Sequence, residues 1–91
     1  MKKFTLPQRE AQILMEVLNG APTNGITVGQ MRIALKLAAI VEPAAASKEG
    51  GEVMLEDADY SHLRARLESQ MWVVVSPKIL SLVDLVEGAT S

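Results

Sequence analysis

The segment 27–42 constrains the fold more than any other part of this 91-residue chain. Its sequence, TVGQMRIALKLAAIVE, is apolar around most of a helical circumference. Thr27 and Gln30 have the spacing of a capping box, which predicts that a helix begins here, and Pro43 predicts that it ends at residue 42. A helix of this kind needs several neighbours to cover it, from the same chain or from another protein. We therefore expect it to be the central helix of the domain.

A first covering helix is expected over residues 6–19. Thr5 and Gln8 repeat the capping-box spacing, and Pro7 is tolerated in a first turn, where backbone N–H groups have no helical partner. Gly20 suits the left-handed position that often follows a helix. The apolar residues at helical spacing predict one inner stripe, which holds Ile13, Leu14, Val17 and Leu18.

Two further helices are expected in the C-terminal half. Asp57 or Asp59 is expected to cap the third helix, because acids favour helix N-termini. Ser76 and Pro77 are expected to begin the fourth helix, and Gly88 to end it. The predicted inward residues of the third helix are Tyr60, Leu63 and Leu67, continued by Met71.

The remaining segments complete the expected fold. Residues 43–52, PAAASKEGGE, have the small, charged and glycine-rich composition of a mobile loop. Residues 53–55 and 73–75 could form two very short strands. We predict a mainly α, compact four-helix single domain, and the alternative is a small α+β domain in which these strands pair. The apolar content of 48% with only 3% aromatic residues suits helical packing.

Composition limits the functional classes. The chain has no cysteine, which excludes disulfides and cysteine-ligated zinc. The longest nearly apolar run, 33–41, is interrupted by Lys36 and is too short to span a bilayer. The N-terminal residues MKKFTLPQRE have no apolar core of a signal peptide. These features predict a soluble, cytoplasmic protein that does not bind a membrane.

No catalytic, cofactor or metal site is expected. His62 is the only histidine, so metal sites that need two histidines are excluded. Asp59, His62 and either Ser61 or Ser69 supply the residue types of a catalytic triad, but neighbours on one helix rarely reach its geometry. An acidic run favours helix capping and a solvated loop, with a negative docking patch as the alternative; its members are Glu49, Glu52, Glu56, Asp57 and Asp59.

A DNA-binding regulator or co-regulator of helix-turn-helix type is the alternative function. It would use the helices at 6–19 and 27–42, with Arg32 and Lys36 offered to the bases. The connector is longer than the three or four residues of that motif. The net charge of −2 also disfavours nucleic acid, since phosphate contacts supply much of the affinity.

The C-terminal half resembles small accessory proteins of tailed bacteriophages. The resemblance lies in an acidic helix start, a leucine-spaced helix, a tryptophan and a short last helix; its residues are Asp57, Asp59, Tyr60, Leu63, Leu67, Trp72 and 79–86. It implies a non-enzymatic role, either in assembling part of a virion or in binding and redirecting a host protein.

The leading hypothesis is therefore a protein–protein interaction module without enzymatic activity. Its partner would be a host or virion protein or a second copy of the chain, which would make it a homo-oligomer. Trp72 is interpreted as a core anchor or, if exposed beside Met71, as the centre of the contact. The predicted partner-binding residues are Tyr60, Arg64, Met71 and Trp72, with the loop 44–52 as a secondary surface.

Overall fold

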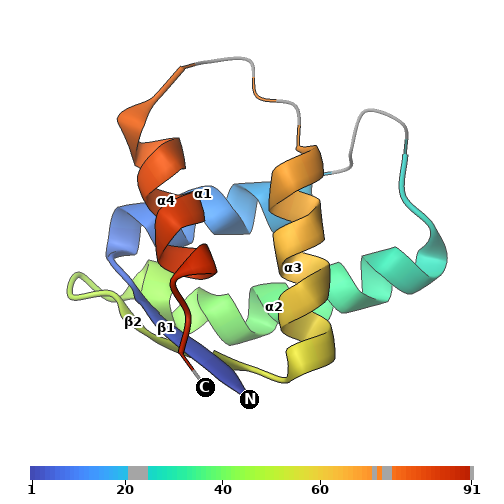
Figure 1. Ribbon diagram of the computed structural model, residues 1–91, viewed down its shortest axis with the longest axis horizontal. Helices are drawn as coiled ribbons and strands as arrows, with labels where there is room; N and C mark the ends of the chain where they lie inside the picture. The colour runs from blue at the N-terminus through green and yellow to red at the C-terminus, as the bar shows by residue number, and fades with distance from the viewer. Residues whose placement is uncertain (21–24, 71, 73–74, 91) are drawn as a thin grey trace.

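The computed structural model describes residues 1–20, 25–70, 72 and 75–90 (Figure 1). Within these residues the chain forms four helices and a two-stranded antiparallel sheet, which confirms the mainly α fold class. The elements are β1 (Lys2–Leu6), α1 (Gln8–Asn19), α2 (Val28–Ala46), β2 (Gly51–Leu55), α3 (Asp57–Ser69) and α4 (Pro77–Glu87).

The strand β1 was not expected from the sequence. It pairs with β2, and Lys2 lies opposite Leu55 while Leu6 lies opposite Gly51. The predicted strand at 53–55 is confirmed, but its partner is β1 rather than 73–75. Residues 73 and 74 lie outside the described part of the chain, and Val75 is not in a strand. Alternate residues of both strands face the core, namely Phe4, Leu6, Val53 and Leu55.

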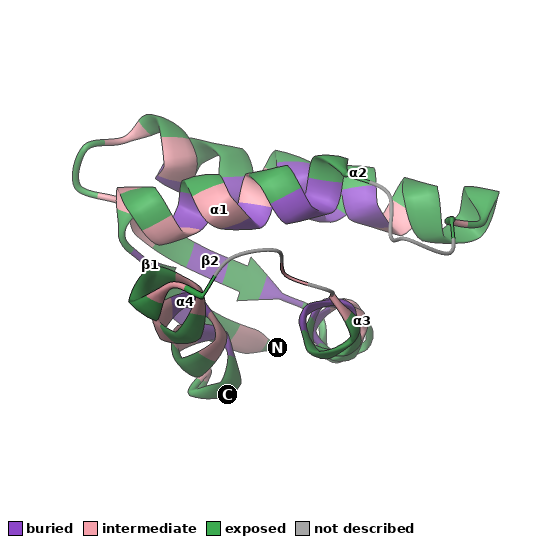
Figure 2. Cartoon of the chain, turned by 90° about the horizontal axis from the view of Figure 1, so that it is seen from above, coloured by how far each residue is buried: buried purple, intermediate pink, exposed green. Residues whose placement is uncertain are grey.

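The helices enclose one apolar core. In Figure 1, α1 and α2 run horizontally and α3 and α4 run across them, and Figure 2 shows the buried faces turned inward. The predicted stripe of α1 is confirmed, because Leu14, Val17 and Leu18 are buried and Ile13 packs against them. Leu63 and Leu67 of α3 are also buried, as predicted.

Helix α1 begins and ends differently from the prediction. Thr5 belongs to β1, so the capping box with Gln8 does not form, and Pro7 occupies the cap position without a side-chain hydrogen bond. Gly20 follows the helix with a φ of −95°, which is not left-handed. The strand prevails because pairing with β2 buries Phe4 between the helices.

Helix α2 begins as predicted but is longer. Thr27 and Gln30 form the capping box, with both hydrogen bonds at 3.1 Å. Pro43 does not end the helix; it lies inside α2 on the solvent side, where a missing N–H bond costs least. Ala44 continues the buried face.

The expected mobile loop 43–52 is therefore mostly regular structure. Only residues 47–50 connect α2 to β2. Gly50 closes this turn with a φ of +74°, a conformation that favours glycine. The predicted secondary contact surface at 44–52 is accordingly a helix end, a tight turn and part of a strand.

The last two helices begin in different ways. Glu56 occupies the cap position of α3 without a side-chain hydrogen bond, so neither Asp57 nor Asp59 is the cap, although both lie in the first turn. Ser76 and Pro77 begin α4 as predicted, and the Ser76 hydroxyl accepts from the Lys78 N–H. Gly88 ends α4, also as predicted.

Candidate functional site

One side of α2 is apolar and uncovered. The exposed fractions of Val28, Met31 and Leu35 are 65%, 46% and 57%, and Ala39 continues the same side one turn later. We call these four residues the outer face of α2. The opposite side holds the buried residues Ala34, Leu37, Ala38, Val41 and Ala44. The sequence predicted that α2 needs neighbours on most sides; α1, β2 and α3 pack against it, and the outer face is left uncovered by the described residues.

The N-terminal turns of α2 extend beyond the rest of the molecule. Figure 1 shows this end of α2 projecting past α3, and Figure 2 shows it almost wholly exposed. The capping box makes the projection possible, because it satisfies N–H groups of the first turn without help from another element. The outer face therefore begins on a helix N-terminus that is stabilised by its own capping residues.

A shallow hollow adjoins the outer face where the end of α1 meets the start of α2. Its volume is about 230 Å³. Met31 and Leu35 form one wall, and Leu18 and Ile26 contribute further apolar surface. The described residues of its lining carry no charged side chain, so this hollow suits an apolar side chain from another molecule.

The two cations of α2 differ in their surroundings. The Lys36 Nζ lies 2.8 Å from the Asp59 Oδ2 of α3, and this hydrogen bond, together with the negative charge, raises the pKa of Lys36. Arg32 is exposed and forms no ion pair among the described residues. A DNA-reading helix would need both cations free, and Lys36 is already neutralised.

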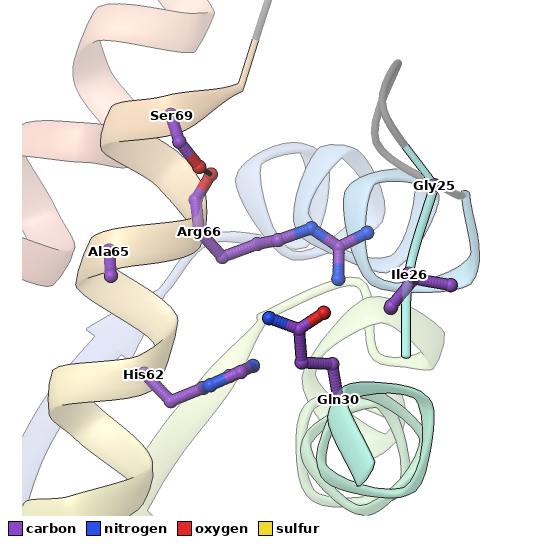
Figure 3. Close-up of a pocket in the computed structure, with 7 residues that line it drawn as sticks. All are labelled: Gly25, Ile26, Gln30, His62, Ala65, Arg66 and Ser69. Atoms are coloured by element: carbon purple, nitrogen blue, oxygen red, sulfur yellow. Dashed lines mark hydrogen bonds between the residues drawn. The ribbon is translucent and has the colours of Figure 1, made fainter. Parts of the chain in front are cut away.

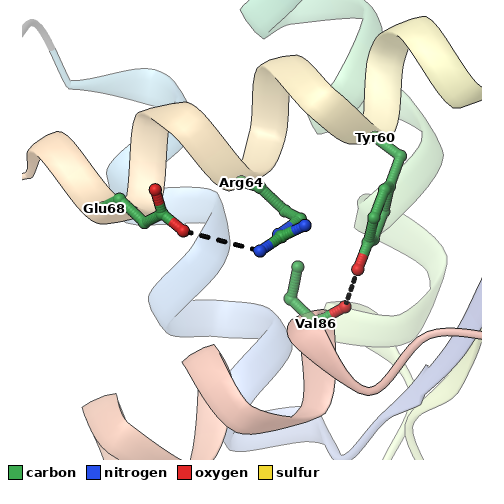
Figure 4. A network of polar contacts seen from close by, with 4 residues as sticks. All are labelled: Tyr60, Arg64, Glu68 and Val86. Atoms are coloured by element: carbon green, nitrogen blue, oxygen red, sulfur yellow. Dashed lines mark hydrogen bonds and ion pairs between the residues drawn. The ribbon is translucent and has the colours of Figure 1, made fainter.

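Of the predicted partner-binding residues the structure describes Tyr60, Arg64 and Trp72, and these three differ in exposure. Tyr60 is only 7% exposed, and its hydroxyl donates a 2.6 Å hydrogen bond to the Val86 carbonyl oxygen (Figure 4). Its burial removes it from the surface on which a contact was predicted. Trp72 is half-buried and packs against the core, in line with its interpretation as a core anchor. Met71 lies outside the described residues.

Among the described members of the predicted contact set, Arg64 is the one that is clearly exposed. Its Nη2 lies 3.7 Å from the Glu68 Oε1 one turn later, and its guanidinium stands 5.9 Å from the centre of the Tyr60 ring. These contacts place it on the side of α3 that faces α4 (Figure 4). Its described contacts are therefore with α3 itself and not with the outer face of α2.

The residue types of a triad do not assemble. Among the described residues, His62 has no hydrogen bond to Asp59, which pairs with Lys36 instead. Ser69 donates its hydroxyl proton to the Arg66 carbonyl oxygen at 3.2 Å. Asp57 lies 3.3 Å from the N-terminal amino group. The described part of the chain contains no group of three residues that could hold a metal ion.

Arg66 is the feature that sequence reasoning missed. It lies on the side of α3 that meets α1, and it is 7% exposed. Its Nη2 donates to the carbonyl oxygens of Val17, at 2.7 Å, and Gly20. It thus satisfies carbonyl groups that the end of α1 leaves free. The sequence did hold one indication that Arg66 is buried, because it lies beside Leu63 and Leu67 on the predicted inward side of the helix.

Comparison of the chain with protein-family models, curated proteins and solved structures finds no match. No helix in the described part of the chain is long and apolar enough to cross a membrane.

Proposed function

We propose that the protein is a non-enzymatic protein–protein interaction module that binds through the outer face of α2. The observation that supports this is the exposure of Val28, Met31 and Leu35 at the spacing i, i+3 and i+7 on one helix. This spacing is the one by which helices recognise one another. Exposed apolar residues gathered on one surface favour a contact, whereas scattered ones need no explanation.

The energetics favour a partner of moderate affinity. Completing the burial of a half-exposed large apolar side chain contributes on the order of 1 kcal/mol. Three such side chains, with the adjoining hollow, supply the apolar centre of a contact, and the polar rim would come from α1. The helix is already formed, so binding costs little conformational entropy.

The partner we infer is an amphipathic helix of another protein with an acidic residue beside its apolar stripe. Arg32 borders the outer face and has no ion pair among the described residues, so it would receive the acid. The bacteriophage likeness of the C-terminal half supports a virion or host protein as the source of this helix. A second copy of the chain is the remaining choice of partner.

Two leucines allow a matched test. Leu35 on α2 and Leu80 on α4 are exposed by 57% and 65%, so Leu35→Glu and Leu80→Glu change the surface equally without disturbing the core. The probes are helical peptides displayed on yeast, with apolar residues at i, i+3 and i+7 and either glutamate or lysine flanks. We expect the glutamate-flanked peptides to bind, and Leu35→Glu to weaken binding by at least about tenfold while Leu80→Glu does not.

Further variants separate the parts of the proposal. Arg32→Glu should shift the preference towards the lysine-flanked peptides. Light scattering behind size-exclusion chromatography measures self-association, and a dimer that only Leu35→Glu disrupts would assign the partner to a second copy. Equal weakening by Leu35→Glu and Leu80→Glu, or no binding by either peptide set together with a monomer at all concentrations, would refute the proposal.

A further inference from the structure

A second hollow lies on the other side of Ile26, between the start of α2 and α3. Its volume is about 270 Å³. Figure 3 shows the ends of the His62, Arg66 and Gln30 side chains directed toward the same space. The described residues of the lining are Gly25, Ile26, Gln30, His62, Ala65, Arg66 and Ser69. We call this the Arg66 hollow.

Arg66 brings a buried positive charge to this hollow. More than nine-tenths of the residue is buried, and its Nη2 donates only to the neutral carbonyl groups of Val17 and Gly20. Its Nε is buried and has no hydrogen-bond partner among the described residues. Burial lowers the pKa of the guanidinium, yet an arginine stays charged in proteins. A buried charge of this kind is costly unless an opposite charge compensates it.

The described residues provide no such compensation. The described lining residues include no aspartate or glutamate, and the ion pairs of the described chain involve other groups. Arg64, two residues earlier, has Glu68 as its partner on the exposed side of the same helix. Arg66 is thus the buried arginine without a carboxylate, and Arg64 the exposed one with a carboxylate.

Gln30 adds an oriented donor. Its Oε1 accepts from the Thr27 N–H in the capping box, which fixes the amide and leaves the Nε2 group to donate elsewhere. Figure 3 places the amide nitrogen of Gln30 toward His62. His62 has a ring nitrogen that can donate, and it has no hydrogen bond among the described residues.

From this arrangement we propose that the Arg66 hollow binds a small oxyanion, in which Arg66, Gln30 and His62 donate to the carboxylate or phosphate oxygens. Guanidinium groups suit both classes, because their N–H groups match pairs of oxygen atoms. Among the described residues, the Arg66 hollow shares only Ile26 with the hollow beside the outer face of α2, and it includes none of the residues of that face.

The decisive variant is Gln30→Glu. Glutamate at this position preserves a capping box with Thr27, so α2 should still begin normally. The new carboxylate would occupy the hollow and repel an added anion. Arg64→Gln is the control, because it removes a neighbouring arginine charge outside the hollow. Arg66 itself is a poor test position, since it also satisfies the end of α1.

The measurement is an NMR titration of the arginine Nε–H signals, with sodium phosphate and sodium acetate against sodium chloride at constant ionic strength. We expect the Arg66 signal to shift and saturate with phosphate, acetate or both. Gln30→Glu should weaken this binding by about tenfold or more, and Arg64→Gln should leave it unchanged. Preference for phosphate or for acetate identifies the source of the oxyanion.

Two results would overturn the proposal. One is a linear shift of all arginine signals with every salt, chloride included, which would show only screening of surface charge. The other is a Gln30→Glu variant that folds normally, as judged by a circular dichroism spectrum like that of the unmodified chain, and that binds the anion with the same dissociation constant. His62→Leu provides a second check, because loss of one donor should raise the dissociation constant without affecting α1.

Discussion

The Tyr60 hydroxyl donates a 2.6 Å hydrogen bond to the Val86 carbonyl oxygen and so joins the first turn of α3 to the last turn of α4. The ring of Tyr60 also packs against Phe4 of β1, with ring centres 6.4 Å apart. One side chain therefore links three elements that are distant in the sequence.

Tyr60→Phe tests the polar part of this link. Removing the hydroxyl leaves the Val86 carbonyl with fewer partners in a buried place, which should lower the free energy of unfolding by about 1 kcal/mol. Urea denaturation measures the change. Ser61→Ala, at an exposed neighbouring position, is the control and should change it by less than about 0.5 kcal/mol. Equal effects would show that the hydrogen bond contributes nothing specific.

The two arginines of α3 should differ strongly in their contribution to stability. Arg66→Met would leave the carbonyl groups of Val17 and Gly20 unpaired at the end of α1, at a cost of about 2 kcal/mol. Arg64→Met removes only an exposed ion pair and a contact with Tyr60, worth less than about 1 kcal/mol. Thermal unfolding measures the loss of stability in both variants. A larger loss in Arg64→Met than in Arg66→Met would contradict the structural role of Arg66.

Two glycines should respond to alanine in opposite directions. A Cβ on Gly50 would collide with the Leu6 carbonyl oxygen, and φ there is +74°, so Gly50→Ala should destabilise the fold by about 2 kcal/mol or more. Gly29 lies in the first turn of α2 with no close neighbour, so Gly29→Ala should stabilise it by about 0.5 kcal/mol. Chemical denaturation of both variants measures the change in the free energy of unfolding, which should fall for Gly50→Ala and rise for Gly29→Ala.

The ion pair of Lys36 with Asp59 predicts a dependence on alkaline pH. The folded pKa of Lys36 is raised, so the stabilisation is fully present below its ordinary value of 10.5 and is lost as the pH rises through the raised value. Unfolding curves from neutral to strongly alkaline pH should therefore fall more steeply for the unmodified chain than for Lys36→Met. Parallel curves would show that the pair does not contribute to folding.

The sequence predicted the helices well where local signals agree with packing. The capping box of Thr27 and Gln30 and the start of α4 at Ser76 and Pro77 depend on neighbouring residues, and both are present. The same spacing at Thr5 and Gln8 misled the prediction, because the competing partner of Thr5 is Glu52, which lies far along the chain. A five-residue strand has too little alternation to reveal a distant partner.

The candidate sites depended on long-range contacts and could be predicted only in part. The excess apolar surface of α2 was visible in its sequence, but which side stays uncovered was decided by where α1 and β2 pack. Arg66 resembled any other helical arginine, since its carbonyl partners belong to α1. Tyr60 was read correctly as an inward residue, and that same burial removes it from the predicted contact surface.

The backbone of Lys3 exchanges hydrogen bonds of 2.8 and 2.9 Å with Thr90, on the strand that also pairs with β2. On the ribosome, β1 is made before residues 51–55, with which it pairs, and Lys3 can pair with Thr90 only after the intervening chain has been made. Contacts between such distant positions slow folding, because the intervening chain must be ordered before they form. The pairing of β1 is therefore complete only after all four helices of the described chain have been synthesised.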